Sequence, residues 1–145
     1  MAGKVLLIGR VVFSFFFIYS GFNHLTKLSM YSQYAGASGV PAPTLLTAIS
    51  GLMLLAGGVS ILLGVQVRWG SLLIAAFLIP AAFLVHKFWG IADPMAAANQ
   101  AAQFWKNISL TGACLTFYAL ATMYPARWPY SLGRSGATGG GAATS

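Results

Sequence analysis

The stretch FLVHKFWGIADPMAAANQAAQFWKNISLTG, residues 83–112, decides how this chain folds. It begins at the end of one long apolar run and ends inside the start of the next. Between these runs it gathers a histidine, two lysines, two glutamines, asparagine and Asp93, the only acidic residue of the chain. In a chain this apolar, such a gathering of polar side chains needs a physical reason.

The composition indicates a protein that lies in a lipid bilayer. Its 145 residues are 58% hydrophobic and 6% charged. Soluble domains carry roughly 25% charged residues. The net charge of +7 comes from basic residues scattered singly at the ends of apolar runs. That pattern is typical of positions that flank membrane spans, so we expect no nucleic-acid partner.

Four apolar segments are long enough to cross a hydrocarbon core about 30 Å thick, which takes roughly 20 helical residues. Backbone groups in lipid must be hydrogen-bonded within the chain, so these segments are helices. Their short links predict an all-α, up-and-down four-helix bundle, with short interfacial helices in the outer links. We expect spans at 5–22, 45–65, 69–88 and 104–124, a transmembrane domain over 1–131, and a disordered Gly/Ala/Ser/Thr-rich tail over 132–145.

The basic residues also predict orientation. Five Lys and Arg share one face with the two termini, whereas the opposite, outer face carries three and Asp93. The positive-inside rule therefore favours cytoplasmic termini. The first apolar run contains Arg10 and is followed by no small-x-small cleavage site, which favours a retained span. Arg10 either reaches the near interface or pairs inside the bundle.

Small residues predict where the helices touch. Because lipid provides no hydrophobic drive between helices, close backbone approach is what associates them. The predicted packing residues are Ser50, Gly51, Gly57, Gly58 and Gly64 on the second span, and Ser109 and Gly112 on the fourth. Pro80 predicts a kink in the third span, and Asp93-Pro94 predicts a helix start.

The predicted topology brings polar ends of the first, third and fourth spans to the outer face. Ionisable groups at membrane depth usually face a cavity or a partner, which favours a ligand-binding mouth. The alternative is interfacial anchoring by lysine and ordinary interhelical hydrogen bonds. The candidate ligand-binding residues are His24, Lys27, His86, Trp89, Gln103, Trp105, Lys106 and Asn107. We assign no catalytic residue and expect no metal site.

Several short motifs occur along the chain in an order and with a spacing that resemble those of a known family. They are SGFNHLTK (20–27), GVPAP (39–43), GGVSILLG (57–64), HKFW (86–89), Asp93-Pro94 and FWKN (104–107). From about residue 10 to residue 131 the chain resembles the DoxX family of small bacterial membrane proteins. The resemblance implies a four-helix inner-membrane protein, linked by its name to a thiosulfate:quinone oxidoreductase subunit and to redox-stress partners. Many members carry a glutamate where this chain has Met53-Leu54-Leu55, so a carboxylate role there is absent.

These observations predict a non-catalytic accessory subunit of a quinone-linked redox complex in the inner membrane. The alternative is a quinone-interacting oxidoreductase subunit with a donor-lined pocket at the outer face. We rank two further functions below these: haem binding by His24 and His86 in the bundle, and small-solute transport. Transport ranks low because the sequence lacks the inverted repeat expected of secondary transporters. The expected partners are the lipid bilayer and either a larger oxidoreductase complex or further copies of the chain. Cys114, the only cysteine, is interpreted as a small buried hydrophobe.

Overall fold

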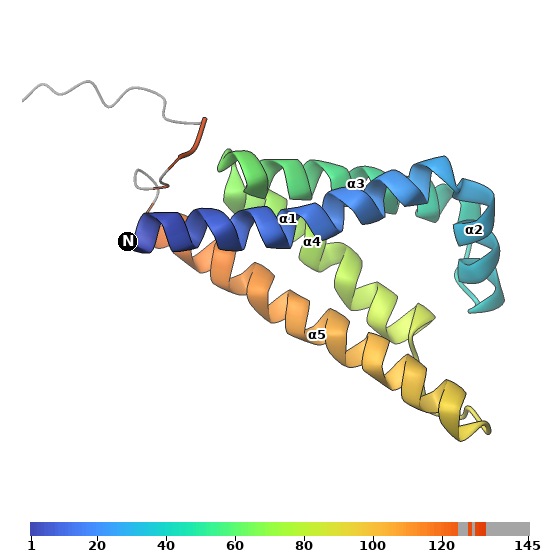
Figure 1. Ribbon diagram of the computed structural model, residues 1–145. Helices are drawn as coiled ribbons and strands as arrows, with labels where there is room; N and C mark the ends of the chain where they lie inside the picture. The colour runs from blue at the N-terminus through green and yellow to red at the C-terminus, as the bar shows by residue number, and fades with distance from the viewer. Residues whose placement is uncertain (125–127, 129, 133–145) are drawn as a thin grey trace, which may run out of the picture.

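All secondary structure in the described residues is helical (Figure 1). The computed structural model describes residues 1–124, 128 and 130–132. The elements are α1 (Ala2–Thr26), α2 (Leu28–Ala37), α3 (Pro43–Leu63), α4 (Val67–Pro80), a π-helical segment η1 (Ala81–Val85) and α5 (Pro94–Met123). Apart from Leu132, the predicted tail at 132–145 lies outside the described residues.

Three helical stretches in the described part of the chain are long and apolar enough to cross a membrane. They are α1, α3 and the continuous stretch of α4 and η1, and they match the first three predicted spans. α5 has 30 residues but is not among them. Its N-terminal half carries Gln103, Lys106 and Asn107, which lower its apolar character. The all-helical class is therefore confirmed, whereas a fourth span and a transmembrane four-helix bundle stay predictions.

The long helices form two pairs that diverge from one end of the molecule. α1 packs on α3, α4 packs on α5, and α3 joins the two pairs through its contacts with α4. Figure 1 shows the pairs close together near the N-terminus and well separated at the other end, where α2 lies beside α3. The molecule therefore has the shape of a wedge, closed at the terminal end and open near α2.

Local sequence signals explain where the helices begin and end. Asp93 caps α5, because its carboxylate accepts hydrogen bonds from the backbone N–H groups of Met95 and Ala96 at 3.3 and 3.1 Å. This confirms the predicted helix start at Asp93-Pro94. The short helix predicted in the first link is α2. The second expected short helix, residues 95–99, is instead the first part of the continuous α5.

Glycines set the closest contacts between helices, as the small-residue pattern indicates. A Cβ atom on Gly21 of α1 would lie 2.7 Å from the Gly51 carbonyl oxygen of α3. Gly58 faces α1 in the same way, and Gly57 faces Gly70 on α4. The backbones of α1, α3 and α4 approach so closely because these positions lack a side chain.

The other predicted packing residues have different roles. Gly64 has a φ of 70° and ends α3 in the left-handed conformation that favours glycine. Ser50 is hydrogen-bonded to His24 across the α1–α3 contact. Ser109 and Gly112 lie on an exposed face of α5, and a Cβ on Gly112 would meet no atom within 4 Å. Within the described chain this face of α5 is uncovered, so helix packing through these two residues stays a prediction.

Arg10 pairs inside the protein rather than reaching the interface. Its side chain is fully buried, and Nε donates a 2.9 Å hydrogen bond to the backbone carbonyl of Ile61. Nη2 donates to the carbonyl of Leu62, and the guanidinium lies 5.7 Å from the centre of the Trp128 ring. The last carbonyls of a helix lack intrahelical partners and carry the negative end of its dipole. Arg10 therefore caps α3 from the neighbouring helix.

The kink predicted at Pro80 takes the form of a change of helix type. α4 ends at Pro80 and continues as the π-helical η1. The backbone N–H of His86 donates to the carbonyl of Ala81 at 3.0 Å, five residues earlier. π turns are rare and frequently occur at functional sites. Here the turn ends beside His86, one of the candidate ligand-binding residues.

We predict that Gly21→Ala destabilises the protein, whereas Gly9→Ala in the same helix does not. The new methyl group on Gly21 would meet backbone atoms of α3 below 3 Å, but the one on Gly9 would meet nothing within 4 Å. Overpacking of this kind costs about 1–3 kcal/mol, whereas an open Gly-to-Ala change in a helix gains up to about 1 kcal/mol. Thermal unfolding in detergent measures the change in stability of each variant relative to the wild type. Equal midpoints for the two variants would contradict the assigned α1–α3 contact.

Candidate functional site

A cavity of about 500 Å³ lies in the open part of the wedge. Residues from α1 to α5 and from η1 contribute to its lining, so it is formed only when the whole fold is assembled. Most of its walls are apolar or aromatic, with Phe16, Phe17 and Phe77 among them. Cavities of 300–1,000 Å³ with apolar walls and a few polar groups are typical binding sites for small molecules.

The structure brings five of the eight candidate binding residues to this one cavity. They come from three segments that are far apart in the sequence: the end of α1, the residue after η1 and the N-terminal half of α5. The five are His24, His86, Gln103, Lys106 and Asn107. Their convergence follows from the antiparallel arrangement of the long helices, and their role in binding stays a prediction.

His24 is held by a hydroxyl on the facing helix. Its Nδ1 lies 2.8 Å from the Oγ of Ser50, and the same hydroxyl donates to the Thr47 carbonyl at 2.8 Å. The imidazole ring is 4.5 Å from the Tyr31 ring and meets the Phe77 ring edge-on at 5.7 Å. The ring is therefore fixed in position and orientation at the cavity wall.

His86 belongs to a hydrogen-bonded chain across three elements. Its Nδ1 lies 3.0 Å from Oε1 of Gln100 on α5, and Nε2 of that amide donates to the Tyr34 hydroxyl on α2 at 3.0 Å. His86 is the first residue beyond the third span. Burial lowers the pKa of its imidazole, the bond to Gln100 partly opposes this, and the charge of Lys106 adds to the lowering. His86 is therefore neutral at about pH 7.

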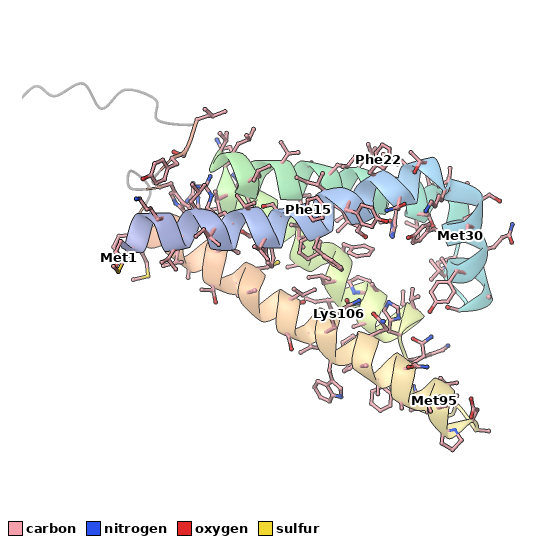
Figure 2. The ribbon with its side chains drawn as sticks, viewed as in Figure 1. Met1, Phe15, Phe22, Met30, Met95 and Lys106 are labelled. Atoms are coloured by element: carbon pink, nitrogen blue, oxygen red, sulfur yellow. The ribbon has the colours of Figure 1, made fainter. Side chains whose placement is uncertain are left out.

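Lys106 and Asn107 provide hydrogen-bond donors to the cavity. The Lys106 ammonium donates to Oε1 of Gln103 and lies 5.6 Å from the centre of the Phe16 ring on α1. Figure 2 shows Lys106 on the N-terminal half of α5. Asn107 is only 5% exposed, and no described residue is hydrogen-bonded to its side-chain amide. Among the described residues the one fully enclosed side-chain polar atom without a partner is Ser14 Oγ, so the Asn107 amide is still accessible from the cavity and presents an open binding group.

Three candidate residues lie away from the cavity. Lys27 is exposed at the junction of α1 and α2. Trp89 and Trp105 are 52% and 58% exposed and pack edge-on against Phe104. Neither indole lines this cavity; exposed tryptophan is common at membrane interfaces, and a role of the two in binding stays a prediction.

The sequence reasoning missed the aromatic walls and the groups that hold the histidines. Tyr31 and Tyr34 had a detectable signal, their i,i+3 spacing in the first link, but it indicates only a short interfacial helix. Ser50 was assigned to packing, and its hydrogen bond to His24 adds a second role. Phe16 and Phe77 carry no signal, because every apolar helix in this chain contains phenylalanine or leucine at similar spacing.

Comparisons with known proteins support a family assignment. The family model DoxX matches residues 5–87. The chain is 30% identical over 111 residues to the inner membrane protein YphA of Escherichia coli (strain K12), an alignment that covers 77% of this chain and 79% of that protein. No solved structure matches the chain.

We predict that acidification destabilises the protein partly through His86. Because burial lowers its folded pKa below the ordinary value, the unfolded chain takes up the proton more readily, and stability is lost as the pH falls from about 7 to about 5. His86→Gln should reduce the fall in unfolding temperature, whereas Lys87→Gln, an exposed neighbour, should leave it unchanged. Parallel pH profiles for wild type and His86→Gln would refute this.

Proposed function

Because the chain belongs to the DoxX family, we propose that it is a small bacterial inner-membrane subunit that binds a quinone-type molecule in its cavity. In this proposal the chain catalyses no reaction by itself and serves a larger redox complex. The observation that carries the proposal is the convergence of His24, His86, Lys106 and Asn107 on one apolar cavity.

The proposal includes a complete transmembrane arrangement. The three apolar spans are joined by α5 as a fourth crossing, since α5 is long enough and packs along α4. Gln103, Lys106 and Asn107 line the cavity, which reconciles these three polar residues with a position in the bilayer. The excess of basic residues on the terminal face supports cytoplasmic termini, so that the cavity opens towards the outer face.

The cavity has the size and the chemistry that a quinone head requires. Its walls of Phe16, Phe17 and Phe77 suit a flat ring. The carbonyl oxygens of a quinone accept hydrogen bonds. Lys106 Nζ and the amide of Asn107 are donors on a single helix at the cavity wall.

The charge balance also favours a ligand with electron-rich oxygens. Asp93 is the only acidic residue in the chain, and both of its carboxylate oxygens are used in capping α5. No acidic side chain of this chain is therefore left to pair with the Lys106 ammonium at the cavity. A positive group with a neutral amide as its hydrogen-bond partner attracts an acceptor from the ligand.

The accessory role rests on what the chain contains. Its one cysteine, Cys114, is buried in the core, so the chain has no pair of thiols to exchange electrons. Electrons for a bound quinone would come from a partner protein. The exposed face of α5 with Ser109 and Gly112 is a candidate contact for such a partner, because small residues permit close helix approach.

We predict that Lys106→Met weakens binding of decylubiquinone to the purified protein by roughly tenfold to a hundredfold, the effect of losing a hydrogen bond from a charged donor. Lys87→Met is the matched control, because Lys87 is exposed and does not line the cavity. Quenching of tryptophan fluorescence reports the titration. No binding to the wild type, or equal weakening by both variants, would refute the proposal.

We also predict that the chain co-purifies with an oxidoreductase in mild detergent and that Gly112→Leu disrupts this association. The added side chain would protrude from the exposed face of α5. Gly9→Leu is the control, since Gly9 lies on an equally open surface of α1. Recovery of only a monodisperse homo-oligomer from wild-type membranes would exclude a stable partner complex.

A further inference from the structure

The hydrogen bonds around His24 determine which of its ring nitrogens carries the proton. Ser50 has a single hydroxyl proton, and it is donated to the Thr47 carbonyl, which can only accept. The 2.8 Å contact between Ser50 Oγ and His24 Nδ1 is then a bond in which the imidazole donates. In the neutral ring, Nδ1 carries the proton and Nε2 carries a lone pair.

His86 is held in the same form by a different group. Gln100 directs its carbonyl oxygen to Nδ1 of His86 and its NH₂ group to the Tyr34 hydroxyl. An amide oxygen only accepts, so Nδ1 of His86 also carries the proton. No described residue is hydrogen-bonded to Nε2 of either histidine. Both histidines line the cavity, so each contributes an Nε2 lone pair that no described residue occupies, in addition to the donors on α5.

We infer that the cavity selects the reduced, dihydroxy form of its ligand, a quinol, over the oxidised quinone. This inference rests on the proposed function and specifies which redox form the site holds. Ser50 and Gln100 are positioning residues in it, since they act on the ligand through the tautomers of His24 and His86.

The selectivity follows from matching donors with acceptors. A quinol has two O–H groups that donate to the Nε2 atoms, and its oxygens still accept from Lys106 and Asn107. A quinone has only acceptor oxygens, which satisfy the α5 donors but leave the imidazole lone pairs facing another acceptor. A buried acceptor without a partner weakens binding by roughly tenfold to a hundredfold.

The experiment compares three ligands of nearly the same shape on the purified full-length protein under argon. These are decylubiquinol, decylubiquinone and the dimethyl ether of the quinol, which keeps the oxygens but lacks both O–H groups. We expect the quinol to bind about tenfold or more tightly than the other two. Equal affinity for quinol and ether, or tighter binding of the quinone, overturns the inference and leaves the proposed function standing. Failure of all three to bind overturns both.

Two variants distinguish an effect of the His24 tautomer on ligand preference from a general effect of the substitution on the fold. Ser50→Ala removes the acceptor for His24 Nδ1 and should reduce the ratio of quinol affinity to quinone affinity. Ser60→Ala is the matched control, because Ser60 is also on α3 and donates to a backbone carbonyl, that of Val65, but does not line the cavity. An unchanged preference in Ser50→Ala overturns the assigned role of that hydroxyl.

The tautomers can be read directly. The chain has only two histidines, so ¹⁵N-histidine labelling gives a spectrum that a His86→Gln variant assigns. We expect a protonated Nδ1 and an unprotonated Nε2 at both residues in the free protein. A protonated Nε2 at His24 overturns the inference. A Soret band in the purified protein also overturns it, because haem iron would then occupy the same lone pairs.

Discussion

The buried guanidinium of Arg10 is the interaction on which the shape of the molecule depends. It ties α1 to the C-terminal carbonyls of α3 and lies against Trp128, which follows α5 in the chain. A charge in this position is tolerated because the end of α3 provides acceptors and a negative dipole. Three parts of the chain are thus fastened at the terminal end, and the short link from Gly64 to Gln66 joins α3 to α4 at that same end.

Because the fold is fastened at one end, the other end can open without loss of the core. The helix pairs diverge, and the cavity between them has mostly apolar walls with a few polar groups. Ser50 holds His24 across α1 and α3, and Gln100 connects His86 to α2. The hydrogen bonds that connect the helices at the open end therefore involve the same residues that give the cavity its hydrogen-bonding character. Stability and binding are coupled at this end of the molecule.

Much of the fold was predictable because apolar length, glycine spacing and Asp93-Pro94 are local signals. The cavity residues His86 and Lys106 were predictable from topology, since antiparallel helices bring their ends together. The remaining features of the cavity depended on how each helix is rotated about its axis and tilted against its neighbours. The rotation of α5 about its axis places Trp105 and Gly112 on the outside of the molecule. The tilt between the helix pairs opens the wedge. No local sequence pattern encodes either the rotation or the tilt. The two alternatives for Arg10 differed only in whether carbonyl groups of another helix were near, which sequence spacing does not reveal.

The π turn at Ala81–Val85 makes chain length a determinant of this site. Such a turn contains one residue more than the α turn it replaces, and each residue rotates the chain by about 100° about the helix axis. A related sequence that is one residue shorter here would resume ordinary helical winding and turn the imidazole of His86 away from Gln100. A relative that shares every polar residue of this chain, but has one residue fewer in this turn, would therefore lack the arrangement of these residues that forms the site.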